Sequence, residues 1–195
     1  MAASKISAPG RAPRAGRSRG YFGIGVERAS KPMNLGNLFR TAHAFGASFV
    51  FTVAPHRTVG RIRSDTSITP RHVPYYSFAD AESMTLPQRC DVVGIELLEE
   101  AGALPSFRHP RSAAYVLGPE RGELSRAMRD RCDHLVRIPT AFSLNLATAG
   151  AIVMYDRLIA LARFARRPSI PGVAPEPEPA HVAGAPVRRP RAGAG

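Results

Sequence analysis

The sequence predicts an α/β fold in which a mostly parallel sheet is flanked by helices. Short apolar segments of strand length alternate along the chain with segments of helical character, which is typical of a parallel sheet with helical connections. The chain has 195 residues, enough for one domain with a substantial core, and it contains no internal repeat. We therefore expect one α/β domain.

Six segments are expected to be strands because they are apolar or alternate in polarity over the length of a strand. They are YFGIGVE (21–27), SFVFTV (48–53), HVPYYSF (72–78), DVVGIEL (91–97), AAYVLG (113–118) and HLVRIP (134–139). Three segments have helical character: 34–46, which ends at Gly46, 123–132 and 145–167. Residues 55–71 are basic and are expected to form a loop.

Both ends of the chain differ in composition from the middle. Residues 1–19 are rich in Gly, Ala, Pro and Arg, and residues 166–195 in Pro, Ala and Arg, so we expect disordered basic tails on a domain that spans 20–165. The net charge is +12, and residues 1–19 alone carry five basic residues and no acidic one. This asymmetry suggests contact with nucleic acid or another anionic surface, although solvated tails in an arginine-rich proteome would give the same pattern.

Several functional classes are excluded by what the sequence lacks. Cys90 and Cys132 belong to no CxxC motif, so we expect reduced thiols and no zinc site. No apolar run reaches the ~18 residues of a membrane span, and the start of the chain has no apolar signal region, so we expect a cytoplasmic protein. A P-loop and a GxSxG nucleophile elbow are missing, and "GIGVER" lies within a strand rather than after one.

The segment KPMNLGNLFRTAHAFG (31–46) predicts an amphipathic helix. Its apolar residues recur at the spacing of one buried face: Leu35, Leu38, Phe39, Ala42 and Phe45. Asn34, just before them, is a suitable N-cap. Arg40 falls roughly opposite the apolar face, where an arginine is usually only solvated.

Two later segments place polar residues beyond the ends of strands. In YVLGPERGELS (115–125), Gly118 allows close backbone approach and Glu120 stands where ligands bind in open α/β sheets, although a turn with Glu123 near the start of a helix explains the pattern as well. In RIPTAFSLNLATAGAIVMYD (137–156), Ser143 and Asn145 precede a helix rich in small residues. Either could simply cap that helix, and the small residues could serve only close packing.

Together and in this order, the three segments resemble the SpoU/TrmH family of SPOUT-class RNA 2′-O-methyltransferases. The resemblance covers residues 21–162. It implies an α/β sheet whose C-terminal part forms a trefoil knot, S-adenosyl-L-methionine bound in that knot, a homodimer, and tRNA or rRNA as substrate. We expect a member that consists of the catalytic domain alone, without the N-terminal RNA-binding domain that many relatives carry.

The family's site residues carry over by position. Asn34 and Arg40 match the polar pair of the first motif, Glu120 the acid of the second, and Ser143 and Asn145 the polar pair of the third. The resemblance also implies that the cofactor is held mostly by backbone groups of the knot loops. Here these lie around Leu97, Gly118, Ile138, Ser143 and Leu144.

Arg40 is expected to act on the ribose 2′-hydroxyl. Family accounts make this arginine a base. A guanidinium group loses its proton only at a pH above about 12, so we favour polarisation of the hydroxyl and positioning of a phosphate. No metal is needed, because the methyl group leaves an already activated sulfonium cation.

The sequence departs from the family pattern at two places. Glu123 stands where the second motif usually has glycine, and only residues 140–142 separate Pro139 from Ser143. Two alternatives stay open: a non-catalytic RNA-binding or assembly protein that keeps the knotted fold, and a methyltransferase that acts on a base nitrogen.

Overall fold

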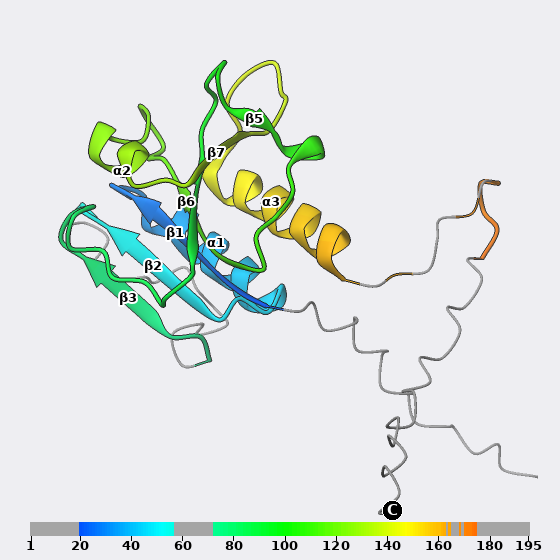
Figure 1. Ribbon diagram of the computed structural model, residues 1–195, viewed down its shortest axis with the longest axis horizontal. Helices are drawn as coiled ribbons and strands as arrows, with labels where there is room; N and C mark the ends of the chain where they lie inside the picture. The colour runs from blue at the N-terminus through cyan, green and yellow to red at the C-terminus, as the bar shows by residue number, and fades with distance from the viewer. Residues whose placement is uncertain (1–19, 57–71, 163, 165–167, 169, 175–195) are drawn as a thin grey trace, which may run out of the picture. The chain divides into compact units, whose positions relative to one another are not determined.

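The computed structural model describes residues 20–56, 72–162, 164, 168 and 170–174 (Figure 1). The chain divides into two units, Met1–Arg163 and Phe164–Gly195. The predicted tail 1–19, the predicted tail 166–195 except for residues 168 and 170–174, and most of the predicted loop 55–71 lie outside the described residues. In the second unit, the described residues form a turn that Val173 closes by donating its backbone N–H to the carbonyl of Ile170. The first unit holds the sheet and its helices.

Seven strands form one sheet in which every pair is parallel, which confirms the predicted class. The strands are β1 (Tyr21–Glu27), β2 (Phe49–Val53), β3 (Tyr75–Phe78), β4 (Asp91–Ile95), β5 (Gly102–Ala103), β6 (Ser112–Leu117) and β7 (His134–Arg137), in the order β3-β2-β1-β6-β4-β7-β5. The strands in the middle of the sheet are almost wholly buried, because helices and connections cover both faces. The carboxyl ends of all seven strands therefore lie at one edge.

Two helices cover one face of the sheet. The buried residues of α1 (Pro32–Ala44) and α3 (Leu146–Leu161) pack into one core cluster with β1, β4 and β6, while α2 (Arg126–Asp130) packs with β2 on the other face. At Gly150 of α3, a Cβ atom would lie 2.2 Å from a methyl carbon of Leu38 on α1. The close helix packing predicted from the small residues is confirmed at this point.

The apolar face of α1 is buried as predicted, but the predicted N-cap is wrong. Leu35, Leu38, Phe39 and Ala42 are fully buried, and Phe45 packs partly against them. The helix begins earlier, with Lys31 as N-cap and Pro32 in the first turn, where its missing N–H costs nothing. Asn34 therefore lies inside the helix, and its side chain is available for contacts beyond it.

The structure adds two short elements that the sequence pattern did not indicate. These are β5 and the single 3₁₀ turn η3 (Leu104–Ser106). The helix predicted at 123–132 is only five residues long, because Ser125 caps it by accepting a hydrogen bond from the backbone N–H of Met128. The strand predicted at 72–78 is limited to Tyr75–Phe78.

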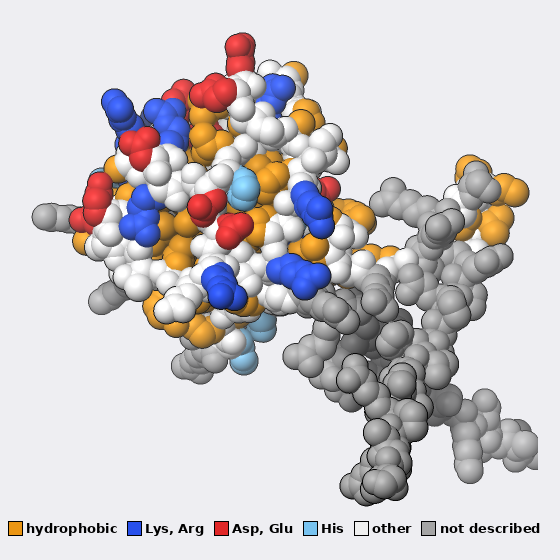
Figure 2. All heavy atoms as spheres, viewed as in Figure 1, with side chains coloured by type: hydrophobic (Ala, Val, Ile, Leu, Met, Phe, Trp, Pro, Cys, Tyr) orange, Lys and Arg blue, Asp and Glu red, His pale blue; other side chains and the backbone are white. Residues whose placement is uncertain are grey.

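Figure 2 shows cationic and anionic side chains interspersed over one face of the molecule, with apolar side chains between them. The described residues of the first unit thus present no single basic field on that face. Among the described residues, no helix has both the length and the apolar character that crossing a membrane would require.

A buried guanidinium group fastens α3 to the amino ends of the central strands. Arg157 is 2% exposed and donates to the carbonyls of Tyr21 (3.2 Å) and Arg111 (2.7 Å), and to the hydroxyl of Tyr115 (3.1 Å). His109 bridges the Tyr115 hydroxyl (2.6 Å) and the Asp156 carboxylate (2.9 Å). Burial lowers the pKa of His109, although Asp156 acts in the opposite direction. Arg157, His109 and Tyr115 thus form one hydrogen-bond network at the end of the sheet opposite the carboxyl ends of the strands.

Replacing Arg157 by Met should lower the free energy of unfolding by about 3 kcal/mol, because buried carbonyls lose their donor. Arg126→Met is the control, since the Arg126 side chain is 90% exposed, and it should cost less than about 0.5 kcal/mol. Urea denaturation of the three proteins measures both values. Equal stability of the two variants would contradict the anchoring role of Arg157.

Candidate active site

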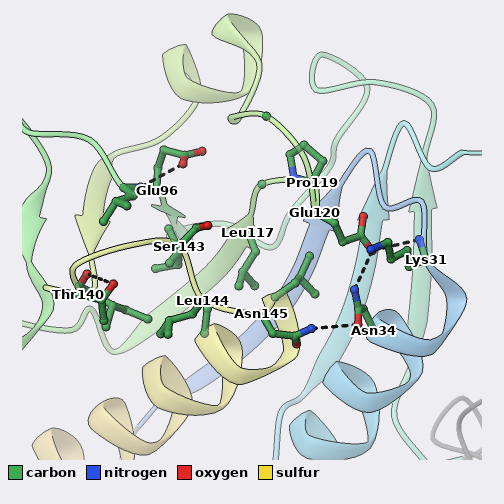
Figure 3. A pocket seen from close by; sticks show the side chains of 17 residues that line it. Lys31, Asn34, Glu96, Leu117, Pro119, Glu120, Thr140, Ser143, Leu144 and Asn145 are labelled. Atoms are coloured by element: carbon green, nitrogen blue, oxygen red, sulfur yellow. Dashed lines mark hydrogen bonds between the residues drawn. The ribbon is translucent and has the colours of Figure 1, made fainter.

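A cavity of about 290 Å³ opens at the carboxyl ends of the strands (Figure 3). Its walls come from four stretches that are distant in sequence: the start of α1, the end of β4, the loop after β6, and the loop between β7 and α3. Its lining residues are Lys31, Asn34, Ile95, Glu96, Leu97, Leu117, Gly118, Pro119, Glu120, Gly122, Ile138, Thr140, Ser143, Leu144, Asn145, Leu146 and Ala149. This is the edge at which open α/β sheets bind ligands.

Glu120 joins the loop after β6 to the start of α1. One carboxylate oxygen accepts from the backbone N–H of Lys31 (3.0 Å) and the amide of Asn34 (3.3 Å). The other accepts from the backbone N–H (3.2 Å) and the hydroxyl (2.8 Å) of Ser30. Burial alone would raise the pKa of Glu120, but these hydrogen bonds outweigh it and hold the pKa below its ordinary value. Glu120 is therefore a carboxylate that also accepts hydrogen bonds from the backbone N–H groups directly before the helix.

The side chains of Asn34 and Asn145 connect the first and third motifs. Asn145 donates from its amide nitrogen to the amide oxygen of Asn34 (3.2 Å), and its own oxygen accepts from the backbone N–H of Ala147 (2.9 Å). Asn145 is thus the N-cap of α3, which the sequence left as one of two roles, and it also belongs to the site. Each amide is oriented by a donor on one side and an acceptor on the other, so one hydrogen-bond chain runs from Glu120 through Asn34 to α3 (Figure 3).

Two glutamates that the sequence analysis did not single out hold the loops around the cavity. Glu96, which follows β4, accepts from the backbone N–H groups of Leu124 (2.7 Å) and Leu97 (3.0 Å). Glu27, the buried last residue of β1, accepts from the backbone N–H (2.7 Å) and the hydroxyl of Ser125. Glu27 ends an apolar strand and Glu96 directly follows one. An acidic residue at such a position could have been recognised in the sequence as a candidate site residue.

Gly118 lies where the contact between Glu96 and Leu124 leaves little room for a side chain. A Cβ atom there would lie 3.1 Å from a carboxylate oxygen of Glu96 and 3.3 Å from the backbone nitrogen of Leu124. The close backbone approach expected at Gly118 is present. It keeps the backbone after β6 open to the cavity.

The remaining predicted residues of the site divide into two groups. Leu97, Ile138, Ser143 and Leu144 line the cavity. Arg40 does not line it. It lies exposed on α1, six residues after Asn34, which corresponds to about 9 Å along the helix axis.

The cavity combines apolar side chains with two carboxyl side chains, Glu96 and Glu120, and with the polar side chains of the three motifs. Among the residues the structure describes, no group of three His, Cys, Asp or Glu side chains could hold a metal ion. Cys90 and Cys132 are free thiols outside the lining, and burial raises the pKa of Cys132 to about 12, so it is a poor nucleophile. The arrangement suits binding and orientation of a bulky organic ligand better than covalent catalysis.

Comparison with known proteins identifies relatives of the chain. The model of the SpoU rRNA Methylase family matches residues 22–155. A 23S rRNA (guanosine-2'-O-)-methyltransferase of Bordetella pertussis is 32% identical over 141 residues, which are 67% of this chain and 56% of that protein. An uncharacterized tRNA/rRNA methyltransferase of Archaeoglobus fulgidus is 31% identical over 146 residues, 70% of this chain and 63% of the relative. The chain thus spans little more than half the length of these relatives.

Among solved structures, the fold is similar to the SpoU methyltransferase AviRb of Streptomyces viridochromogenes in complex with the cofactor AdoMet. The TM-score is 0.61 at 25% identity, and the match covers 73% of this chain and 61% of that one. The sheet and helices described above are therefore those of a known methyltransferase fold.

Glu120→Gln should destabilise the protein at pH 7, because the amide places a donor against the N–H groups of Ser30 and Lys31. Since the pKa of Glu120 is lowered by folding, its stabilisation is present above the ordinary value of 4.5 and is lost as the pH falls through the folded value. The stability difference from wild type should thus shrink in acid.

Urea denaturation at pH 7 and in acid measures this difference. Glu123→Gln is the control, because the Glu123 side chain is 60% exposed and pairs only with Arg129. A Glu120→Gln deficit that does not change with pH would argue against an ionised carboxylate as its source.

Proposed function

The chain belongs to the SpoU rRNA methylase family, and from this premise we propose that it is an S-adenosyl-L-methionine-dependent RNA methyltransferase acting on a ribose 2′-hydroxyl in tRNA or rRNA. The observation that carries the proposal is the hydrogen-bond chain from Glu120 through Asn34 to Asn145 at the wall of the cavity. It unites one polar residue from each of the three motifs. A purely structural role for the three would not require them to meet beside a cavity.

The residues around the cavity fit S-adenosyl-L-methionine. Leu97, Gly118, Ile138 and Leu144 line a cavity that combines apolar and polar residues, which suits a nucleoside without a pyrophosphate. The approach at Gly118 is tight for a Cβ atom, and glycine leaves no side chain at that part of the wall. When bound, the cofactor supplies a methyl group on a sulfonium centre. The Streptomyces relative in complex with AdoMet supports this assignment.

A trefoil knot at the C-terminal side of the sheet is part of the proposal. β7 lies between β4 and β5, although these two strands are consecutive in the chain. Residues 96–101 therefore connect strands on opposite sides of β7, and Glu96 donates its backbone N–H to the carbonyl of Val136 (3.0 Å). The chain that leaves β7 at Ile138 must pass this connection to reach α3. Such an enclosing connection is what a knot crossing requires.

We propose that the protein works as a homodimer in the cytoplasm. Ile152, Tyr155 and Ile159 lie on α3 at helical spacing and are 36%, 53% and 39% exposed. A stripe of this kind on a helix is suited to packing against a second copy.

In the proposed mechanism, the chain positions the nucleotide and assists removal of the 2′-hydroxyl proton. Asn34 and Glu120 hold the start of α1 in place, and Arg40 projects from the exposed side of the same helix. Because Arg40 lies outside the cofactor cavity, we assign it to the RNA: its guanidinium polarises the 2′-hydroxyl and holds a neighbouring phosphate. Ser143 lines the cavity that we assign to the cofactor.

Calorimetry with S-adenosyl-L-methionine, followed by mapping of 2′-O-methyl groups in total RNA with and without the gene, tests the function. We expect cofactor binding and the loss of one defined mark. Retained RNA affinity without cofactor binding would instead support a non-catalytic RNA-binding protein.

Arg40→Ala should leave stability within about 0.5 kcal/mol, because exposed substitutions have small effects. Turnover should fall by about 10²-fold, the scale of a positioned acid–base group, while cofactor affinity persists. Arg40→Lys should restore little, since it keeps the charge but loses the planar fork. Methyl transfer from labelled cofactor measures turnover. Near-full activity of the alanine variant would remove Arg40 from the mechanism.

A further inference from the structure

Lysine is rare in this chain, and one of its lysines lies at the cavity. Of 27 basic residues, only Lys5 and Lys31 are lysines. Lys5 is outside the described residues, whereas Lys31 lines the cavity beside Asn34 and Glu120 (Figure 3). A strong preference for arginine elsewhere raises the question of what an ammonium group does here that a guanidinium group would not.

The backbone of Lys31 is fixed by the site itself. Its N–H donates to Glu120 (3.0 Å), and the residue is the N-cap of α1, directly before Pro32. The side chain therefore leaves from a defined point at the cavity, although it is exposed to solvent. A cation with a fixed origin at the edge of a ligand cavity can meet a ligand reproducibly.

The ammonium group has no acidic partner within the part of the chain that the structure describes. The acids that line the cavity with it, Glu96 and Glu120, are both engaged by backbone N–H groups, and no ion pair within 4.0 Å includes Lys31. The amino end of α1 adds partial positive charge at the same place. An anion is therefore the natural ligand for this group.

We propose that the Lys31 ammonium binds a backbone phosphate of the RNA next to the nucleotide that enters the cavity. This inference rests on the proposed function. An ammonium carries three donors and no acceptor, so this group acts on the phosphate and takes no part in proton removal. It is a phosphate-positioning contact distinct from Arg40, which lies on another part of α1.

The same geometry explains why lysine stands here. An arginine at this position would present a planar fork that pairs with a carboxylate through two hydrogen bonds. The adjacent Glu120 would be the nearest such partner, and it would be drawn away from Ser30 and Asn34. Lysine provides the charge without that competing geometry.

The test compares wild type, Lys31→Gln, Lys31→Arg and a matched control, Arg108→Gln. Arg108 is exposed, lies outside the cavity lining, and precedes β6 at the opposite edge of the sheet. Binding of unfractionated tRNA and of total ribosomal RNA is measured over a range of salt concentrations. Calorimetry with S-adenosyl-L-methionine is carried out on each variant.

We expect Lys31→Gln to reduce the magnitude of the negative slope of log affinity against log salt by about 0.7 to 0.9. The reason is that one phosphate contact fewer releases counterions when the RNA binds. Lys31→Arg should keep the wild-type slope but reduce methyl transfer, through its effect on Glu120. Arg108→Gln should keep the slope, and cofactor affinity should be unchanged in Lys31→Gln.

Three results would overturn the inference. The first is a salt slope of Lys31→Gln that equals the wild-type slope. The second is a reduction of the slope by Arg108→Gln as large as that by Lys31→Gln. The third is a loss of cofactor affinity in Lys31→Gln with an unchanged slope, which would assign the ammonium to the cofactor's carboxylate. Wild-type calorimetry separates these from failure of the proposed function: a wild-type chain without cofactor affinity contradicts the function, while the salt slopes still decide the role of Lys31.

Discussion

Exclusively parallel pairing is the constraint on which the rest of this structure depends. Because all seven strands run in the same direction, each strand ends at the same edge, and the loops that follow β4, β6 and β7 must meet there. The cavity is the space between these loops and the start of α1. Polar residues placed directly after strands, such as Glu96 and Glu120, are brought together although they are far apart in the chain.

At that edge, the Glu120 carboxylate accepts hydrogen bonds both from the residues before α1 and from Asn34 inside it. Glu120 satisfies the N–H groups of Ser30 and Lys31, a task that a capping side chain within α1 would usually perform. Since a residue from the loop after β6 takes this task, Asn34 is released to contact Asn145. The loop after β6, α1 and α3 are thereby held in one arrangement by three side chains.

The sequence predicted the sheet class and nearly all elements correctly, because their apolar periodicity is strong. It missed β5 and η3, which are too short to produce a periodic pattern, and it assigned Asn34 to the N-cap, since the distant Glu120 cannot be seen by local reasoning. Eight of the nine predicted site residues line the cavity, whereas Arg40 lies outside it. The contacts of Glu27 and Arg157 could not be predicted, because their partners lie between 42 and 136 residues away in the chain.

The position of Arg157 determines where this chain could be shortened. The cavity needs nothing from α3 beyond Ala149, so a chain ending soon after that residue would still contain every lining residue. It would, however, lack the guanidinium that fastens α3 to Tyr21 and Arg111 at the far edge of the sheet. The remaining part of the helix would then keep its contacts around Asn145 but lose this anchor. The smallest piece that preserves the cavity is therefore set by a contact on the opposite side of the sheet, about two helical turns past Ala149, the last residue that lines the cavity.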